Sequence, residues 1–541
     1  MGTGMPIAFA SAVCLLSCGG PAARPALPPT VGACEPFATR FDVVEASIAD
    51  LQSAIRTRRA TCHVIVQAYL DRIAHLDSAL GLHAITVTAP DALARADEID
   101  RAISAGGPLG PLFCAPILVK DNYDTVGLPT TAGSAALTGH VALTDAFMVA
   151  ALRRAGAIVL AKTNMAEWAF YPWGTHSGSY GTTANAYATD RSPAGSSGGT
   201  AVGVAESFGV AGLGSDTGNS IRGPSSHAAL FGLRSTLGLA SRGGVVPLFS
   251  DRDVTGPMTR TVEDGARIFE AVSAFDPADP LAALGKLHHE ASYVAFLDRR
   301  GLVGKRIGVV RDLVPRTTDP EVARLFERAL VDLAAAGALL VDPFAIDNFA
   351  AHAKEDSTCP RFRFDVNAYL RAEGASVTFT DVAAVVGAGA YSPDVAAQLK
   401  ELVAVPDTSP DRLSPPCPTY PDHPLRKAFL GDVLASMDRA SVDLLVFPTW
   451  TTIPTRLERV EPDYDGDNSQ VIAPNTGMPA ATVPMGFAYD RLPAGLQLLA
   501  RPFAEGLLFS ASYAFEQATH HRRPPPNVRG CPVSQGAFGV R

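Results

Sequence analysis

Two dense clusters of glycine and small hydroxyl residues lie between Ser192 and Ser226 of this 541-residue chain. The first reads Ser-Pro-Ala-Gly-Ser-Ser-Gly-Gly-Thr-Ala, and the second reads Gly-Ser-Asp-Thr-Gly-Asn-Ser-Ile-Arg-Gly-Pro-Ser-Ser. An apolar segment, residues 202–213, separates them. Glycine lets backbone amides approach a ligand closely, and serine supplies potential nucleophiles. Because free N–H donors beside a nucleophile can stabilise a developing oxyanion, we expect the chemistry of this protein here.

Helical and strand patterns alternate along most of the chain, which predicts α/β layering. No repeat is visible, no mid-chain linker marks a boundary, and hydrophobic residues make up 47% of the sequence. These features predict one large α/β domain. The predicted helices cover residues 43–56, 61–76, 91–104, 145–155, 200–207 and 321–336, and the predicted strands cover residues 116–120, 157–161, 210–213, 306–310, 338–341, 442–447 and 480–483. A stretch rich in Pro and Ser, residues 404–424, is predicted to be a surface loop.

The charge balance argues against a nucleic-acid partner. The chain has 45 basic and 54 acidic residues, giving a formal net charge of −9, whereas nucleic-acid-binding proteins present basic patches or stripes. Acidic surface charge of this size mainly favours solubility. The sequence contains no CxxC or HExxH motif and no clustered His and Cys spacing, so we predict no metal site.

The N-terminus has the features of an export signal. Residues 6–17 form an apolar run that is too short to span a bilayer but long enough for the hydrophobic region of a signal peptide. The run ends in Leu-Leu-Ser-Cys, which resembles the lipobox of bacterial lipoproteins with Cys18 as the lipidated residue. No Lys or Arg precedes Cys18, and a disordered leader or a misassigned start codon is the alternative. We predict export to the cell envelope, with either a lipid anchor at Cys18 or secretion.

Cysteine usage favours an oxidising compartment. If the leader ends at Cys18, six of the eight cysteines remain, and an even number of cysteines in an exported chain suggests disulfides. The favoured pairings are Cys34–Cys62 and Cys359–Cys417, the second of which would tie down the Pro-rich loop. The sequence leaves the connectivity open.

Lys120 is a candidate base for a serine nucleophile. A serine hydroxyl is a poor nucleophile unless a base activates it. Lys120 ends an apolar strand pattern and precedes Asp121-Asn122. Burial of its ammonium group would lower its pKa and leave a neutral amine that can accept a proton. Taken alone, a lysine at a strand end is more often solvated or ion-paired.

Several short motifs occur in a specific order along the chain. They are Cys114-Ala-Pro-Ile-Leu-Val-Lys120-Asp-Asn, Thr130-Thr-Ala-Gly-Ser134, Lys162-Thr-Asn-Met165, Gly195-Ser-Ser-Gly-Gly199, Gly214-Ser-Asp-Thr-Gly-Asn-Ser-Ile-Arg222, Gly232-Leu-Arg-Ser-Thr236, Gly256-Pro-Met258 and Asn475-Thr-Gly-Met-Pro479. The ordered set resembles the amidase signature family of serine hydrolases, from about residue 44 to about residue 524. The resemblance implies a central mixed, twisted β-sheet covered by helices on both faces (α/β/α), hydrolysis of carboxamide C–N bonds, and no metal or cofactor.

The resemblance also implies a Ser–cisSer–Lys triad. Ser220 would attack the substrate carbonyl, and Ser196, on a cis peptide bond after Gly195, would pass the proton to neutral Lys120. Ammonia or an amine would leave the acyl-enzyme, and water would complete hydrolysis. The implied oxyanion hole consists of the backbone N–H groups of Thr217, Gly218, Asn219 and Ser220.

Other residues in these motifs are expected to support the site. Ser197 is expected to shape its loop rather than to relay protons. Asp216 and Arg222 are expected to pair beneath the nucleophile loop and hold its shape. Ser134 and Lys162 match family motifs and are expected to belong to the scaffold.

The sequence departs from the family pattern where glycine is usual. Cys114, Ala194 and Asn219 occupy such positions. Asn tolerates left-handed backbone conformations better than other residues with a side chain, so the oxyanion geometry can survive at Asn219. The Asn side chain would narrow or polarise the site. None of these departures removes a member of the triad.

Two other interpretations of the glycine motifs are weaker. Residues 195–199 formally match GxSxG, with Ser197 as the nucleophile of an α/β-hydrolase and His520 or His521 as its base. That nucleophile elbow directly follows a strand, and no strand pattern precedes it here. The glycines from Gly212 to Gly218 have the spacing GxGxxxG, which is not that of a dinucleotide-binding loop.

Within the family, the main alternative is a glutaminase-type amidotransferase subunit, which would need cytosolic partners. A non-catalytic binding lipoprotein is a further alternative, although the intact triad argues against it. Aromatic residues at 168–173, 362–369 and 450–453 could line the pocket or belong to the core. The predicted organisation is a leader at residues 1–18, a Pro-rich linker at 19–41, an amidase domain at 42–524 with its signature core at 110–265, and a tail at 525–541.

Overall fold

The computed structural model describes residues 41–529. In this part of the chain, eleven strands form one mixed sheet in the order β1-β3-β2-β6-β8-β7-β12-β13-β11-β9-β10, and β4 and β5 form a separate two-stranded sheet. The strands are β1 (Ile85–Thr88), β2 (Pro116–Lys120), β3 (Ile158–Thr163), β4 (His176–Ser177), β5 (Gly181–Thr182), β6 (Ala211–Asp216), β7 (Phe231–Arg234), β8 (Val254–Thr259), β9 (Arg306–Val309), β10 (Leu339–Val341), β11 (Leu444–Pro448), β12 (Ala480–Ala488) and β13 (Leu492–Ala500).

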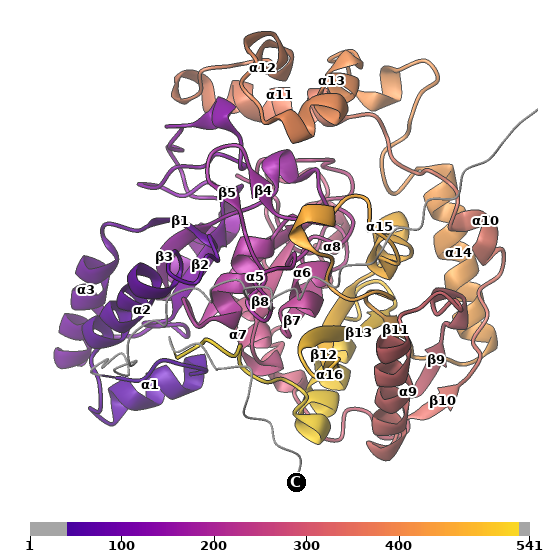
Figure 1. Cartoon of the computed structure of the whole chain (residues 1–541), viewed down its shortest axis with the longest axis horizontal. Helices are drawn as coiled ribbons and strands as arrows, with labels where there is room; N and C mark the ends of the chain where they lie inside the picture. Colours follow the sequence, from indigo (N-terminus) through magenta and orange to yellow (C-terminus); the bar gives the residue numbers. More distant parts are fainter. Residues whose placement is uncertain (1–40, 530–541) are drawn as a thin grey trace, which may run out of the picture.

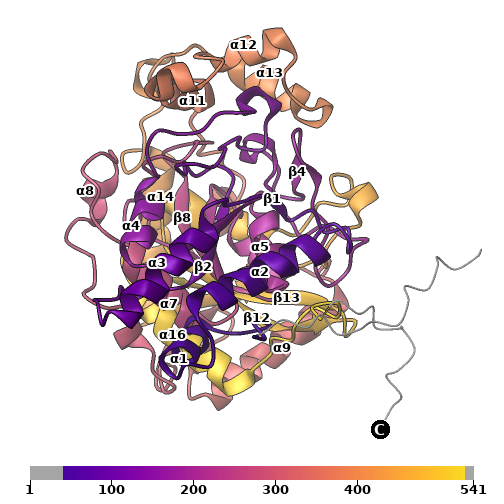
Figure 2. The same cartoon turned by 90° about the vertical axis from the view of Figure 1, so that its left-hand side faces the viewer.

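Helices surround this sheet (Figures 1 and 2). They are α1 (Ile48–Arg56), α2 (Cys62–Leu76), α3 (Ala92–Ser104), α4 (Phe147–Arg154), α5 (Gly198–Ala205), α6 (Arg222–His227), α7 (Val262–Val272), α8 (Ala282–Gly285), α9 (Pro320–Ala335), α10 (Phe349–His352), α11 (Phe362–Glu373), α12 (Val382–Ala388), α13 (Ala396–Ala404), α14 (Pro424–Arg439), α15 (Ala473–Thr476) and α16 (Glu505–Thr519). The predicted fold class, one large α/β/α domain around a mixed sheet, is confirmed.

Strand β2 positions the site. It runs parallel to both neighbours, with Lys120 opposite Thr163 of β3 and Val119 opposite Leu213 of β6. All five of its residues are buried, as expected for a continuous apolar run in a parallel part of a sheet. Because neighbouring parallel strands end at the same edge of the sheet, β2 and β6 bring Lys120 and Asp216 together. The predicted strand at 116–120 is confirmed with the same bounds.

Local capping explains where the predicted helices begin. The helix expected at 43–56 starts only at Ile48, because Ser47 and Asp50 form a capping box that satisfies the first backbone donors. The helix expected at 321–336 is α9. Its N-cap carboxylate, on Asp319, accepts from two backbone N–H groups, and Pro320 occupies the first turn, where a missing N–H costs nothing.

A peripheral helical unit, α11 to α13, lies over one edge of the domain (orange, at the top of Figure 1). Its apolar residues, among them Phe362 and Val366, share a small core with Trp168 and Phe170. A disulfide between Cys359 and Cys417 closes this excursion. The Pro-rich stretch predicted as a loop ends the unit and contains only one short 3-10 turn, Pro410–Arg412.

One predicted disulfide is confirmed and the other is wrong. Cys359 pairs with Cys417, but Cys62 pairs with Cys114 rather than with Cys34. Cys62 begins α2 and Cys114 lies just before β2, so the disulfide joins the start of this helix to the start of this strand. Cys34 lies outside the described residues, as do the predicted leader and linker up to residue 40 and the tail from residue 530.

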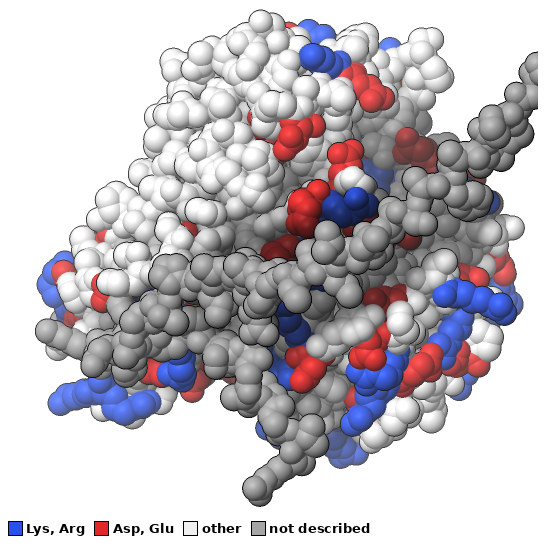
Figure 3. All heavy atoms as spheres, in the orientation of Figure 1, with Lys and Arg blue, Asp and Glu red and all other residues white. Residues whose placement is uncertain are grey.

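The surface carries mixed charge on the face shown in Figure 3. Near α9, Arg and Lys side chains alternate with Asp and Glu, and several of them form ion pairs, for example Arg311 with Glu327 and Arg324 with Glu321. Between residues 41 and 529, no helix is both long enough and apolar enough to cross a membrane.

Candidate active site

The structure brings the three predicted triad residues to one edge of the sheet. Lys120 is the last residue of β2, Ser196 lies in the turn before α5, and Ser220 lies in the turn before α6. Lys120 and Ser196 have no solvent exposure, and Ser220 is 5% exposed. Lys120 Nζ donates hydrogen bonds to Ser196 Oγ (2.7 Å) and Ser215 Oγ (2.9 Å). The predicted Lys–Ser contact is therefore present.

Burial changes the acid–base chemistry of Lys120. Removal from water disfavours the ammonium form and lowers the pKa of Lys120 to about 7, although the negative charges of Asp216 and Asp253 oppose that shift. An ordinary lysine has a pKa near 10.5. A substantial fraction of Lys120 is therefore neutral at neutral pH, and a neutral amine can accept a proton.

The peptide bond between Gly195 and Ser196 is cis, as the family resemblance implies. This turn is packed tightly against its neighbours: a Cβ atom at position 195 would lie 2.1 Å from the carbonyl oxygen of Gly174. Only glycine fits there. The Gly195 N–H donates to the carbonyl of Pro172 (2.9 Å), which fixes the turn.

The turn that carries Ser220 and the turn that carries Ser196 both contact the carbonyl of Pro172. Asn219 Nδ2 donates to Pro172 O (3.2 Å), and Asn219 Oδ1 accepts a long hydrogen bond from Ser220 Oγ (3.4 Å). Within residues 41–529, no hydrogen bond joins the hydroxyls of Ser196 and Ser220. The predicted Ser196–Ser220 step therefore requires Ser220 to turn from Asn219 toward Ser196.

Four consecutive backbone N–H groups are unpaired in the described part of the chain. They belong to the predicted oxyanion-hole residues Thr217, Gly218, Asn219 and Ser220, none of which donates a backbone hydrogen bond there. The next N–H, of Ile221, donates to Asp216 Oδ2 (3.1 Å). Adjacent unpaired donors beside a serine hydroxyl are the arrangement that stabilises an oxyanion.

A buried ion-pair network shapes this turn. Asp216 Oδ2 accepts from Arg222 Nε (3.1 Å), and Asp216 Oδ1 accepts from Arg234 Nη1 (2.9 Å). Burial alone would raise the pKa of Asp216, but the two guanidinium groups outweigh it and hold that pKa well below its usual range. Arg222 Nη2 also donates to the Gly218 carbonyl (2.6 Å). The expected pairing of Asp216 with Arg222 is confirmed.

The other motif residues make structural contacts. Ser197 Oγ donates to the Ser215 carbonyl (3.2 Å). Ser134 Oγ donates to Glu167 (2.8 Å), and Lys162 Nζ donates to the Tyr123 carbonyl (2.7 Å). These contacts fit the scaffold role expected of the three residues.

The GxSxG alternative finds no support in this geometry. The turn that carries Ser197 follows a loop rather than a strand. His521 Nε2 instead contacts the Asp332 carboxylate (2.9 Å) near the end of α16. No hydrogen bond links His520 or His521 to Ser197 within the described residues.

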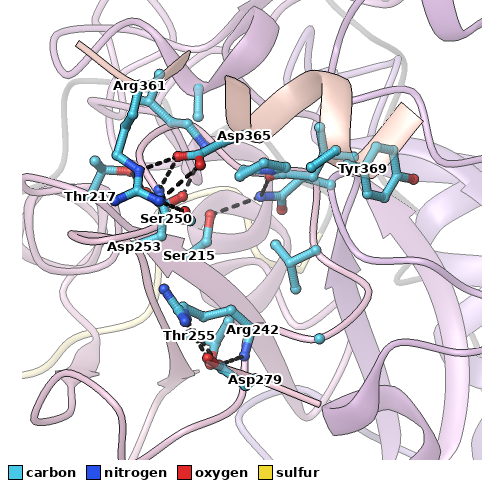
Figure 4. Close-up of a pocket in the computed structure, with 18 of the residues that line it drawn as sticks. Ser215, Thr217, Arg242, Ser250, Asp253, Thr255, Asp279, Arg361, Asp365 and Tyr369 are labelled. Carbon is cyan, nitrogen blue, oxygen red and sulfur yellow. Dashed lines mark hydrogen bonds and ion pairs between the residues drawn. The ribbon is translucent and has the colours of Figure 1, made fainter. Parts of the chain in front are cut away.

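A cavity of about 360 Å³ lies beside Ser215, whose hydroxyl contacts Lys120 (Figure 4). Its wall includes Asn122, Ser215 and Thr217 from the sheet edge, and residues of α11. Arg361 with Asp365 and Arg242 with Asp279 lie at opposite ends of the view. Asp253 also lines the cavity, where burial raises its pKa to about 6, and it accepts a hydrogen bond from Thr217 Oγ1 (2.5 Å).

Sequence reasoning missed Ser215, Asn122 and Asp253. Ser215 and Asn122 lie inside the quoted motifs, next to the expected site residues, and the Asn122 amide donates to Ser215 Oγ (3.0 Å). Gln470 was missed as well: a Cβ atom on Gly218 would lie 1.9 Å from Gln470 Oε1. No motif marks Gln470, because its position depends on a loop that returns from the far end of the sheet.

Some of the predicted aromatic residues lie in the core, and others lie near the candidate site. Trp168 and Phe362 are buried in the small core beneath the helical unit. Ala169 and four residues of α11, Phe364, Asp365, Ala368 and Tyr369, contribute to the cavity wall. Tyr171, Trp173 and Tyr464 are partly exposed and stack on one another, with ring centroids 4.9 and 5.2 Å apart.

Among the described residues, one group could in principle hold a metal ion. Cys359, Cys417 and His423 place their ligand atoms within 4.8 Å of one another. The two cysteines are joined in a disulfide, so they offer no thiolate to a metal.

Comparison with known proteins places this geometry in context. The family model named Amidase matches residues 64–509. A glutamyl-tRNA(Gln) amidotransferase subunit of Thermosynechococcus vestitus is 33% identical over 494 residues, covering 88% of this chain and 99% of the relative. The native peptide amidase of Stenotrophomonas maltophilia superposes with a TM-score of 0.78 at 32% identity, covering 89% of this chain and 98% of that one. An amidase family protein of Bacillus anthracis gives a TM-score of 0.77 at 27% identity, covering 89% and 92%.

Proposed function

The chain belongs to the amidase family, and from that premise we propose that it hydrolyses a carboxamide through an acyl-enzyme on Ser220. The protein is an amide-hydrolysing enzyme. The triad of Ser220, Ser196 and Lys120 is our assignment. It is supported chiefly by one observation, the 2.7 Å hydrogen bond between Lys120 Nζ and Ser196 Oγ in a region without solvent exposure.

In the proposed reaction, Ser220 Oγ attacks the amide carbon while its proton passes to Ser196 and the proton of Ser196 passes to neutral Lys120. The carbonyl oxygen becomes an oxyanion beside the unpaired N–H groups of residues 217–220. The C–N bond then breaks. The leaving nitrogen takes a proton back through Ser196, and an ester to Ser220 remains. Water, activated by the same relay, hydrolyses that ester and restores the free hydroxyl.

A direct test uses a fluorophosphonate probe and a panel of primary and substituted amides. Wild-type protein should be labelled on Ser220, and the variants Ser220→Ala and Lys120→Ala should lose both labelling and hydrolysis. Ser197→Ala is the matched control, because it removes a hydroxyl one residue from the relay. If labelling tracks Ser197 instead of Ser220, the proposal is wrong.

A glutaminase role within an amidotransferase is the second candidate, because relatives named as glutamyl-tRNA(Gln) amidotransferase subunits match over nearly their whole length. Two disulfides in the described chain argue against that cytosolic role, since disulfides are rare in reducing compartments. Peptide amidase structures superpose on most of the chain, which favours an enzyme that acts on a peptide amide. Isolation of the native protein with stable partner proteins would favour the glutaminase role.

We further propose that the protein is exported, and that Cys18 carries a lipid anchor. The two disulfides support an oxidising compartment, and the Leu-Leu-Ser-Cys sequence supports lipidation. Metabolic labelling with a radioactive fatty acid should mark the wild type and spare Cys18→Ser. Recovery of unprocessed, unlabelled protein from the cytosol would refute both parts.

A further inference from the structure

The cavity borders two residues, Ser215 and Asn122, that lie at the lysine end of the proposed relay. Ser215 Oγ accepts hydrogen bonds from Lys120 Nζ (2.9 Å) and from Asn122 Nδ2 (3.0 Å), and both Ser215 and Asn122 form part of the cavity wall. Thr217, the first of the four residues with unpaired N–H groups, lines the same wall. The cavity therefore borders Ser215, which contacts the proposed base, and Thr217, which begins the turn formed by residues 217–220 (Figure 4).

The two ends of the turn formed by residues 217–220 have different neighbours. On the Gly218 side, Gln470 lies against the backbone, and Tyr464, whose hydroxyl accepts from Gln470 Nε2 (3.3 Å), stacks on Trp173. On the Thr217 side lies the cavity. In the reaction proposed above, the leaving nitrogen must collect its proton from Ser196 and Lys120. A group attached to that nitrogen is therefore expected to extend toward the relay, on the side of the turn where Ser215 and Thr217 line the cavity.

Most of the cavity wall is apolar. The apolar wall residues include Val245, Val246, Leu248, Pro280, Phe364 and Ala368. Apolar walls with a few well-placed polar groups are typical of small-molecule sites, and about 360 Å³ lies within the usual range of ~300–1,000 Å³.

Of the two arginine side chains in the wall, one keeps a donor without a partner. Every carboxylate oxygen of Asp253, Asp279 and Asp365 already accepts a hydrogen bond. Arg242 uses Nε and Nη2 on Asp279, but its Nη1 is buried and unpaired, and its side chain is only 10% exposed. The free Nη1 of Arg361, in contrast, faces Asp251 at 3.7 Å. A ligand that fills the cavity is therefore expected to offer Arg242 an acceptor oxygen.

We propose that this cavity is the subsite for the amine half of a secondary amide. The preferred amine has an apolar body and an acceptor oxygen, as in the carboxylate of an apolar amino acid, which Arg242 Nη1 would bind. The inference rests on the proposed amidase function. It adds that the protein cleaves N-substituted amides, with the amine leaving through the cavity after the C–N bond breaks and the nitrogen is protonated.

The test compares three substrates that share the acyl group found best in the amide panel. Their amine halves are ammonia, 3-methylbutylamine and leucine. Wild-type enzyme is expected to have its highest kcat/KM for the leucine conjugate and its lowest for the primary amide. The shared acyl group keeps the acyl-enzyme and its hydrolysis identical, so differences report on the leaving side alone.

Ala368→Trp fills the cavity without disturbing the core, because Ala368 is an exposed residue of α11 that lines it. This variant should lose about 20-fold or more in kcat/KM for both N-substituted substrates through steric exclusion. The primary amide should change by no more than about two-fold. Ala372→Trp is the matched control, since Ala372 is exposed on the same helix one turn away and outside the wall. It should leave all three substrates unaffected.

The double variant Arg242→Met with Asp279→Asn removes the donor that would bind the ligand's acceptor oxygen. Because Asp279 is replaced as well, no buried carboxylate is left unpaired. The double variant should lower kcat/KM for the leucine conjugate by about 10–100-fold, the range for one lost hydrogen bond to a charged group, and spare the 3-methylbutyl amide. The subsite proposal would be overturned if the cavity variants lost kcat/KM equally for all three substrates. It would also be overturned if they lost kcat/KM selectively only when the acyl group is enlarged. Turnover of the primary amide alone by wild-type enzyme would overturn it too. Failure of the amidase function itself would appear separately, as absence of probe labelling at Ser220.

Discussion

Lys120 Nζ lies 2.7 Å from Ser196 Oγ, and neither residue is exposed to solvent. The two residues are 76 positions apart in the chain, and the packing of α5 against β2 brings the turn before α5 to the end of that strand. A fixed, buried contact between an amine and a hydroxyl transmits a proton only if the amine is neutral. The low pKa of Lys120 supplies that condition.

Lys120→Arg should inactivate the enzyme as fully as Lys120→Ala. A guanidinium remains protonated at all accessible pH values, so it keeps the positive charge but cannot accept a proton. We expect kcat/KM to fall by about 10²–10⁴-fold in both variants, the usual contribution of a general base. Steady-state kinetics with the best amide provides the measurement. Activity retained in Lys120→Arg would show that Lys120 acts through its charge alone.

Asp216→Asn should destabilise the protein strongly. The substitution leaves Arg222 and Arg234 buried without their carboxylate, and removing one partner of a buried ion pair costs about 3–5 kcal/mol. Because the folded pKa of Asp216 is lowered, its stabilising contribution is present above pH 3.8, its ordinary pKa, and is lost only as the pH falls toward the folded value. Denaturant unfolding at pH 7 measures the effect.

The control for that measurement is Asp490→Asn. Asp490 forms an exposed ion pair with Arg523, and exposed pairs contribute about 0–1 kcal/mol. Equal effects of the two substitutions would contradict the role given to Asp216.

Asn219→Gly should lower kcat modestly and leave KM nearly unchanged. The variant keeps all four backbone N–H groups but loses the link from the nucleophile turn to the Pro172 carbonyl, to which Gly195 also donates. One neutral hydrogen bond is worth about 0.5–1.5 kcal/mol, which corresponds to roughly two- to ten-fold in kcat. Asn219→Asp, which cannot donate to Pro172, should behave similarly or worse. A rise in kcat would mean that the Asn219–Ser220 contact restrains the nucleophile.

Loss of the Cys62–Cys114 disulfide should lower thermal stability while preserving activity at room temperature. Disulfides contribute about 2–4 kcal/mol, mainly by restricting the unfolded chain. The variant Cys62→Ser with Cys114→Gly restores the residue usual in the family at position 114, where φ is +57°. Differential scanning calorimetry of this pair against wild type gives the size of the effect. An unchanged unfolding temperature would show that the disulfide does not stabilise the fold.

The sequence predicts the parts of this fold that depend on local pattern. Strand β2 is a continuous apolar run whose bounds are correctly predicted, and Lys120 stands out because it ends that run. The ordered motifs, through the family resemblance, identify Ser196 and Ser220 as candidate site residues. Packing between distant segments is harder to predict, and the pairing of Cys62 with Cys114 depends on where the first residue of α2 lies relative to the loop before β2.

The cavity could not be predicted from the sequence, because its wall also depends on packing between distant segments. Its wall combines the sheet edge with α11, a helix that belongs to a disulfide-closed excursion and carries no family motif. Arg242 looks like an ordinary surface residue in sequence, and its unpaired Nη1 becomes visible only when Asp279 occupies the rest of the guanidinium. Contacts of this kind arise from tertiary structure alone.

The most direct test of the central claim is the pH dependence of kcat/KM for wild-type enzyme. If neutral Lys120 accepts the proton, activity should rise with pH through a single ionisation near pH 7, where the Lys120 amine loses its proton, and should then level off. A profile that stays flat from about pH 5 to 9, or one that falls as Lys120 becomes neutral, would contradict this mechanism.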